Sequence, residues 1–82
     1  MELKYNLKVD AMANLYRSAL YMAKGDRETS KMFFDKAKKY LDEKIFVDSQ
    51  DYFSNSNSNN RFFAEMILDK YQIVKNQLFT KQ

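Results

Sequence analysis

The feature that most constrains this chain is its lack of helix breakers. Its 82 residues include no proline and a single glycine, Gly25. Proline removes a backbone donor and clashes with the preceding turn, and glycine loses the most conformational entropy in a helix. Without these residues, the segments on either side of Gly25 can remain helical, and apolar residues recur there every three or four positions. The sequence therefore predicts an all-α fold, a small three-helix bundle with a polar loop before the last helix.

The predicted helices span residues 10–24, 27–46 and 60–79. Asp10, Asp26 and Asn60 are suited to cap their first turns, and Gly25 can supply the left-handed residue that ends the first helix. Residues 48–59 form the predicted loop, because the serines and asparagines of its second half compete for backbone hydrogen bonds. Residues 10–82 are expected to form one helical domain. The predicted apolar stripes are Met12, Leu15, Tyr16, Ala19, Met22 and Ala23; Phe33, Phe34, Ala37, Tyr40, Leu41 and Ile45; and Phe63, Met66, Ile67, Tyr71, Val74 and Leu78.

The first nine residues admit two interpretations. Apolar and polar residues alternate along them, which is typical of a strand. Tyr5 and Val9 are also spaced to continue the stripe of Met12 and Tyr16, which is typical of a helix. We expect residues 1–9 to be an N-terminal arm, either a helical extension or a strand, and favour the extension because a lone strand needs a partner.

Several functional classes are disfavoured by the missing residue types. The chain has no cysteine and no histidine, so thiolate or imidazole metal ligands and the usual neutral-pH acid–base group are absent. The predicted inward faces carry no carboxylates. We therefore expect no enzyme, no metal site, no cofactor and no small-molecule substrate. No apolar run is long enough to span a membrane, and the lack of cysteine fits a reducing cytoplasm.

The aromatic content points to protein binding. The chain has 6 tyrosines and 7 phenylalanines, more rings than three short helices readily bury. Surplus rings on the surface predict contact with another protein or with a second copy in a homodimer. We expect a small adaptor, inhibitor or regulatory subunit. The candidate partner-binding rings are Tyr5, Phe46, Tyr52, Phe53, Phe62 and Phe79.

A spacing of aromatic and small residues links the first two predicted helices. Tyr21, Gly25, Ser30, Phe34 and Ala37 follow one another at intervals of four, five, four and three, and Ser18 adds a further small residue. Residues 14–44 thereby resemble the helical hairpin of a tetratricopeptide repeat. With a third helix, the chain also resembles the three-helix microtubule-interacting-and-trafficking type of domain. Both resemblances imply peptide or helix binding in a groove that the third helix forms with the first or the second.

A second resemblance implies a different function. Residues 5–9, Tyr-Asn-Leu-Lys-Val, resemble the ribbon strand of ribbon–helix–helix DNA-binding proteins, and two helices follow them. By that resemblance the protein is a dimeric DNA-binding regulator, with Lys4, Asn6 and Lys8 reading bases in the major groove. Arg27 or Thr29 would then contact phosphate at the start of the second helix.

Overall fold

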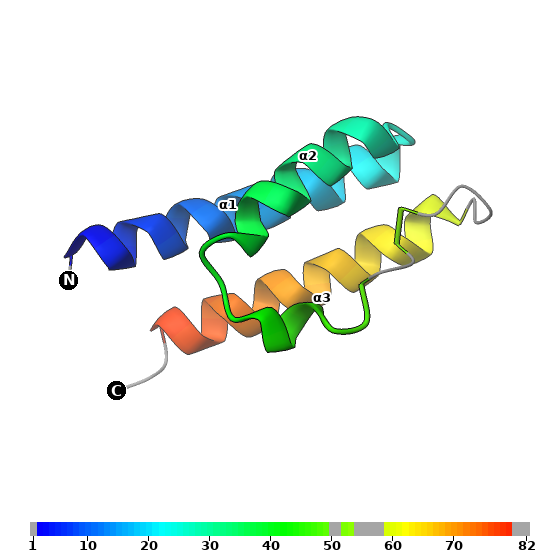
Figure 1. Ribbon diagram of the computed structural model, residues 1–82. Helices are drawn as coiled ribbons and strands as arrows, with labels where there is room; N and C mark the ends of the chain where they lie inside the picture. Colours follow the sequence, from blue (N-terminus) through cyan, green and yellow to red (C-terminus); the bar gives the residue numbers. More distant parts are fainter. Residues whose placement is uncertain (1, 50–51, 54–58, 80–82) are drawn as a thin grey trace.

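The computed structural model describes residues 2–49, 52–53 and 59–79. This part of the chain holds three α-helices and one short 3₁₀ helix, and it contains no strand, so the predicted all-α three-helix bundle is confirmed (Figure 1). The bundle is elongated, with extents of 40 × 19 × 18 Å. The elements are α1 (Glu2–Lys24), α2 (Arg27–Lys38), η1 (Glu43–Phe46) and α3 (Asn60–Phe79).

The turn between α1 and α2 matches the prediction. Gly25 has φ +91°, a conformation that is costly for residues with a Cβ. The amide of Gly25 donates to the carbonyl of Met22 (3.0 Å) and that of Asp26 to the carbonyl of Tyr21 (2.9 Å), the pattern of a Schellman motif. The carboxylate of Asp26 then accepts a hydrogen bond from the amide of Thr29 (3.1 Å) and caps α2. The chain therefore reverses in a tight turn whose hydrogen bonds cap both the end of α1 and the start of α2.

Helix α1 begins earlier than residue 10. It runs without interruption from Glu2, so the N-terminal arm is a helical extension and the strand interpretation of these residues is wrong. Asp10 lies inside this helix and is exposed, so the prediction that it caps the helix is also wrong. No helix-breaking residue separates the arm from the stripe behind it, which is why helical hydrogen bonding continues through both.

Helix α2 ends at Lys38, earlier than the predicted residue 46. Asp42 adopts an extended conformation, and its carboxylate accepts a hydrogen bond from the amide of Lys44 (3.0 Å), which starts η1 in a new direction. Helix α2 ends early because of the path that the chain must take to reach the start of α3. Both α2 and α3 pack on α1 and run antiparallel to it, so the chain must return along the bundle before α3 begins (Figure 1).

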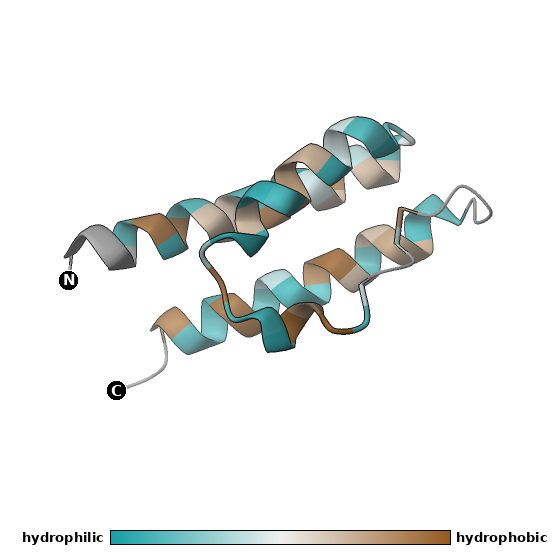
Figure 2. Cartoon of the chain, viewed as in Figure 1, coloured by the Kyte–Doolittle hydropathy of each residue, from teal (hydrophilic) through white to brown (hydrophobic). Residues whose placement is uncertain are grey.

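The returning segment, which we call the linker (residues 39–49 and 52–53), completes the core. Apolar residues recur along it (Figure 2), and their side chains join the core: Phe46 and Tyr52 are buried there, and Phe53 packs against them. The ring of Phe34 on α2 meets those of Phe46, Tyr52 and Phe53 at centroid distances of 5.2, 5.9 and 5.3 Å. Tyr52 in turn lies 5.5 Å from Phe63 on α3. The linker thus occupies the place that a fourth helix has in a four-helix bundle.

A pair of serines sets the close approach of α1 and α2. Ser18 and Ser30 are both fully buried. The hydroxyl of Ser18 donates to the carbonyl of Ser30 (2.8 Å), and the hydroxyl of Ser30 donates to the carbonyl of Ser18 (2.7 Å). Small side chains allow this approach, and the reciprocal bonds satisfy both buried hydroxyls.

Helix α3 has the predicted bounds, 60–79. Its cap is displaced by one residue, because the side chain of Asn59, and not that of Asn60, accepts a hydrogen bond from the amide of Phe62 (3.1 Å). Residues 50–51 and 54–58 of the predicted loop lie outside the described residues.

Candidate protein-interaction surfaces

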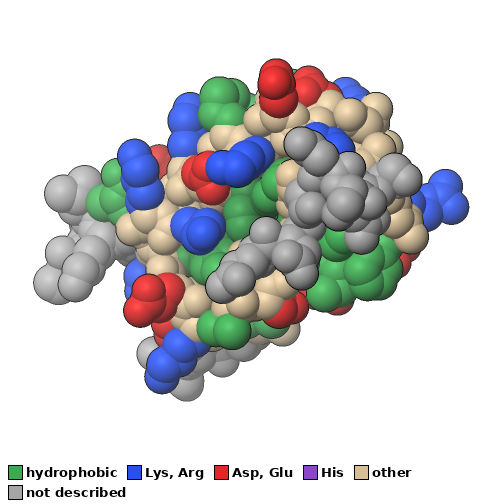
Figure 3. All heavy atoms as spheres, turned by 45° about the vertical axis from the view of Figure 1, so that its right-hand side comes forward, with side chains coloured by type: hydrophobic (Ala, Val, Ile, Leu, Met, Phe, Trp, Pro, Cys, Tyr) green, Lys and Arg blue, Asp and Glu red, His purple; other side chains and the backbone are tan. Residues whose placement is uncertain are grey.

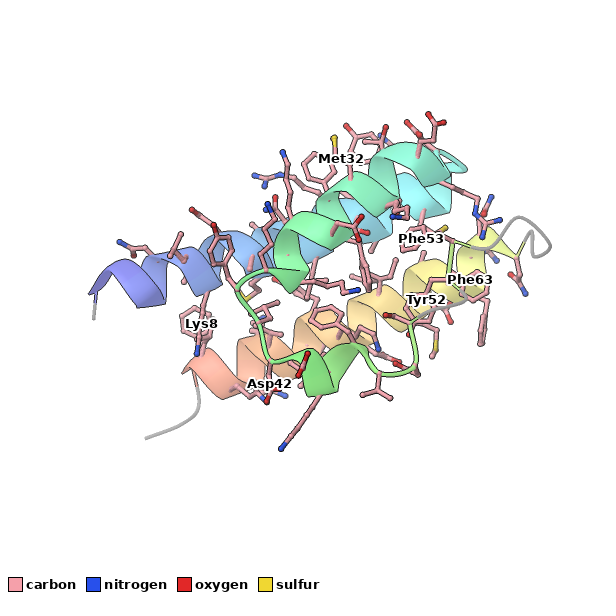
Figure 4. The ribbon with its side chains drawn as sticks, in the orientation of Figure 1. Lys8, Met32, Asp42, Tyr52, Phe53 and Phe63 are labelled. Carbon is pink, nitrogen blue, oxygen red and sulfur yellow. The ribbon has the colours of Figure 1, made fainter. Side chains whose placement is uncertain are left out.

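The predicted partner-binding rings occupy different environments. Phe46 and Tyr52 are 5% and 2% exposed, so the prediction that they lie on the surface is wrong. Phe53 is half-buried against Phe34. Phe62 and Phe79 are about half exposed, at 50% and 51%. The side chain of Tyr5 lies outside the described part. The two buried rings belong to the linker, whose return along the bundle is not predictable from helical periodicity. Figure 4 shows Tyr52 and Phe53 of this segment beside Phe63 on α3.

The residues proposed for DNA reading do not have the required geometry. Residues 2–9 are helical, whereas the ribbon–helix–helix fold requires a strand there. Asn6 and Lys8 are exposed on α1, and the side chain of Lys4 lies outside the described part. Arg27 donates to the carbonyl of Tyr52 (2.8 Å) and lies over the ring of Phe63, 5.9 Å from its centroid. Arg27 therefore contacts both the linker and α3 and helps to hold the linker in place.

Thr29 does not form the phosphate site that the DNA resemblance implies. Its backbone amide donates to the Asp26 carboxylate at the start of α2. Hydrogen bonding to the side chain of Thr29, and then to its backbone amide, holds the pKa of Asp26 below 3.8, so a negative charge occupies the position where a phosphate was expected.

A buried lysine holds the linker against α3. Lys70 is 5% exposed, and its Nζ donates to Oδ1 of Asp48 at 2.8 Å. The same ammonium lies 5.3 Å from the ring centroid of Tyr52, a cation–π contact. The hydroxyl of Tyr52 makes a longer hydrogen bond, 3.4 Å, to Oδ2 of Asp48. These three side chains, the Lys70 cluster, connect both halves of the linker to one position on α3.

The charges in this cluster are fixed. The hydrogen bond from Lys70 lowers the pKa of Asp48 below 3.8. Burial raises the pKa of Tyr52 above 10.0. Burial alone disfavours the charged lysine, but hydrogen bonding to Asp48 and Tyr52 outweighs it and raises the pKa of Lys70 above 10.5. Each pKa moves away from neutrality, so the arrangement is suited to structural locking rather than to proton transfer.

An exposed apolar face lies where α1 and α3 meet. The rings of Tyr16 and Tyr71 are 5.5 Å apart across these two helices, and Tyr16 is 46% exposed. Leu20, one turn from Tyr16, is 44% exposed, and Leu68, one turn from Tyr71, is 37% exposed. At 100° per residue, the members of each helix fall on one side: residues 9, 13, 16 and 20 on α1, and 68, 71, 75 and 79 on α3. We call this surface the α1–α3 apolar face; its members are Val9, Ala13, Tyr16, Leu20, Leu68, Tyr71, Lys75 and Phe79.

A groove lies on the opposite flank of α1. Helix α1 has 23 residues and α2 has 12, so α1 is nearly twice as long at about 1.5 Å per residue. Past the last turn of α2, the N-terminal half of α1 borders a cavity of 360 Å³. An adjoining cavity is also bordered by Lys8. The lining of this overhang groove comprises Leu7, Lys8, Asp10, Ala11, Asn14, Lys36, Lys39 and Tyr40.

Charges of both signs are mixed over the surface. Basic and acidic side chains are interspersed on the face drawn in Figure 3. Within the described ranges, no group of three histidine, cysteine or acidic residues could hold a metal ion. None of the described helices is both long and apolar enough to cross a bilayer.

Two features of these surfaces were missed by sequence reasoning. Lys70 stands four residues before Val74 and three after Ile67, on the predicted apolar stripe, and a lysine at such a position signals a buried ion pair. Leu20 lies on the far side of α1 from the core, where an isolated apolar residue gives little signal by itself. The contact of Tyr16, one turn away, with Tyr71 on α3 exists only when the two helices are packed together.

No protein-family model matches the chain, and no curated protein or solved structure shows significant similarity to it. The resemblance of residues 14–44 to a tetratricopeptide-type hairpin therefore stays a prediction. The groove that this resemblance places between the second and third helices is filled by the rings of the linker.

Proposed function

We propose that this protein is a non-enzymatic protein-interaction module, a small adaptor, inhibitor or regulatory subunit. Its docking surface is the α1–α3 apolar face, and its partner is an amphipathic helix of another protein. The observation that carries this proposal is the exposure of Tyr16, Leu20, Leu68 and Phe79 on two adjacent helices, between 37% and 51% each.

The arrangement of these side chains favours a helical partner. Two antiparallel helices, each with apolar residues in steps of three and four, form a shallow trough between them. An amphipathic helix can lie along such a trough and become the next member of the bundle. Each half-exposed side chain that becomes buried contributes about 1 kcal/mol to binding. The tyrosines at the centre combine a large apolar area with a hydroxyl that can remain hydrated, as is typical of interfaces.

Site-specific photo-crosslinking tests this proposal. A photoreactive phenylalanine analogue is placed at position 20, on the face, or at Asp69, an exposed control position on the outer side of α3. In cells of the source organism we expect one protein to be captured at position 20 and not at position 69. The additional substitution Leu68→Glu should abolish capture while the helical circular dichroism spectrum is retained.

Sedimentation of the purified chain separates this partner from a second copy. Concentration-dependent dimerisation that Leu68→Glu abolishes would assign the face to a homodimer. A strict monomer that also captures no protein above the position-69 control contradicts the proposed function.

A further inference from the structure

We infer that the overhang groove is a second docking site, and that it takes an acidic amphipathic helical segment of a partner protein. The groove lies on the α2 side of α1 and does not overlap the α1–α3 apolar face. The groove would therefore bind a partner of different chemistry from the one that the α1–α3 apolar face binds. Its role does not depend on the function proposed above.

The shape of the groove indicates a helix. Leu7 and Ala11 are four residues apart on α1 and face the line along which α2 packs. Helix α2 ends at Lys38, and the chain then turns away into the linker, so no helix of the described residues continues this line beyond Lys38. The first half of α1 thus has an apolar row on its α2 side and a cavity of 360 Å³ beside it. A helical segment placed there would continue the packing that α2 begins.

The charge of the groove indicates an acidic segment. Among the described residues, Lys8, Lys36 and Lys39 line it, against one carboxylate, Asp10. The ion pairs found among the described residues use Lys31 and Lys70, neither of which lines the groove. The ammonium of Lys36 makes a cation–π contact with Phe33, 5.7 Å from its ring centroid, which leaves its positive charge without a carboxylate partner among the ion pairs of the described residues. Carboxylates one turn apart on a bound helix would reach these ammonium groups, while its apolar side chains cover Leu7 and Tyr40.

A peptide fits this surface better than a nucleic acid. The accessible apolar part of the groove is the half-buried side chain of Leu7 and the half-exposed ring of Tyr40, beside the fully buried Ala11, and Asp10 is exposed at its edge. A track for a nucleic-acid backbone would need a row of cations without an acid among them. The combination of an apolar floor and a basic rim instead matches the two faces of an acidic amphipathic helix.

Nuclear magnetic resonance titration of the full ¹⁵N-labelled chain tests the inference. The probe is a synthetic peptide of about 18 residues, long enough to form a helix, with leucines three and four residues apart and glutamates elsewhere. A matched peptide has glutamine in place of every glutamate. We expect saturable shifts of the amides of Leu7, Ala11, Lys39 and Tyr40 with the glutamate peptide, and binding at least about tenfold weaker with the glutamine peptide.

Charge-reversal variants assign the binding to the groove. Lys36→Glu combined with Lys39→Glu should weaken binding of the glutamate peptide about tenfold. Lys38→Glu is the matched control: it places an acid in the same last turn of α2 but outside the groove, and it should change the affinity less than about twofold. Circular dichroism of each variant verifies that the bundle is retained.

Three outcomes overturn the inference. They are no saturable binding at about 1 mM peptide, equal binding of the glutamate and glutamine peptides, and shifts confined to the α1–α3 apolar face. Tighter binding of a short DNA duplex through Lys36 and Lys39 would assign the groove to nucleic acid instead. None of these results bears on photo-crosslinking at position 20, so failure here and failure of the proposed function are distinguishable.

Discussion

At the scale of single residues, Lys70 shows how one charge can be buried in a small bundle. The side chain of Lys70 is 6% exposed, whereas the side chain of Asp48 that pairs with it is 57% exposed. Asp48 therefore keeps part of its hydration, and the desolvation cost falls mainly on the lysine. The ring of Tyr52 offsets some of that cost through its electron-rich face.

Removing the partner of this buried charge should be costly. We expect Asp48→Ala to lower the free energy of unfolding by about 1–3 kcal/mol, because the ammonium of Lys70 is left without a counter-charge. The matched control is Asp35→Ala, which breaks the exposed pair with Lys31 (2.9 Å) and should cost less than about 0.5 kcal/mol. Urea unfolding followed by circular dichroism measures both values. Equal losses for the two variants would show that burial of Lys70 is of no energetic consequence.

The same cluster predicts sensitivity to alkali. The pKa values of Lys70 and Tyr52 are both raised in the folded protein. The folded state therefore binds these protons more tightly than the unfolded state does. Their contribution to stability is complete below the ordinary pKa values of 10.5 and 10.0, and it is lost as the pH rises through the raised values.

We thus expect the urea midpoint to fall above a pH of about 10. Tyr52→Phe removes one of the two titrating groups, so its midpoint should fall less steeply over the same range. Urea unfolding across a pH series measures the effect. A parallel decline in both proteins would contradict the role assigned to the tyrosine.

At the scale of elements, the α1–α2 hairpin depends on a close approach at two small residues. Ser18 and Ser30 exchange hydrogen bonds across the interface, and their Oγ atoms lie 3.0 Å apart. The rings of Tyr21 and Phe33 stack beside them at 5.7 Å, on the outer edge of the same seam. The hairpin is thus held by polar bonds at its centre and by aromatic packing at its edge.

Enlarging one of these serines should separate the helices. Ser18→Ala should cost about 1 kcal/mol through the lost hydrogen bonds, and Ser18→Leu should cost about 1–3 kcal/mol more through overpacking. Ala23→Leu, a comparable enlargement at an exposed position of α1, should change the stability by less than about 0.5 kcal/mol. Thermal unfolding of the three variants tests this order, and Ser18→Leu as stable as the unmodified chain would refute it.

At the scale of the whole molecule, the linker completes the packing of the bundle. Helices α2 and α3 both pack on α1, but the rings of Phe46, Tyr52 and Phe53 fill the space between them. Phe34 is the centre of that contact, since it meets all three rings and is 2% exposed. The bundle is therefore one cooperative unit in which the irregular segment contributes as much to the core as a helix does.

Truncating the central ring should affect the entire molecule. Phe34→Ala should cost about 3–5 kcal/mol, a large part of the total stability of a domain of this size. We expect the near-ultraviolet circular dichroism of the tyrosines to be lost and the thermal midpoint to fall sharply. Phe34→Leu keeps most of the volume and should cost about 1–2 kcal/mol. Retention of the near-ultraviolet signal in Phe34→Ala would show that the linker is held by other contacts.

The sequence alone determined what depends on near neighbours in the chain. The class of fold, the bounds of α3, and the reversal at Gly25 and Asp26 all follow from periodicity and capping, which act over three to five residues. The exposure of Phe62 and Phe79 was expected and is observed, because both lie toward the outer side of an already predictable helix.

Only the tertiary structure decided where the linker runs. The end of α2 at Lys38, the burial of Phe46 and Tyr52, and the pairing of Lys70 with Asp48 all require α2 and α3 to point the same way along α1. That arrangement depends on contacts between residues far apart in sequence, about which helical periodicity carries no information. The same holds for the two candidate docking surfaces, since each is formed by side chains from two elements and exists only once those elements are packed.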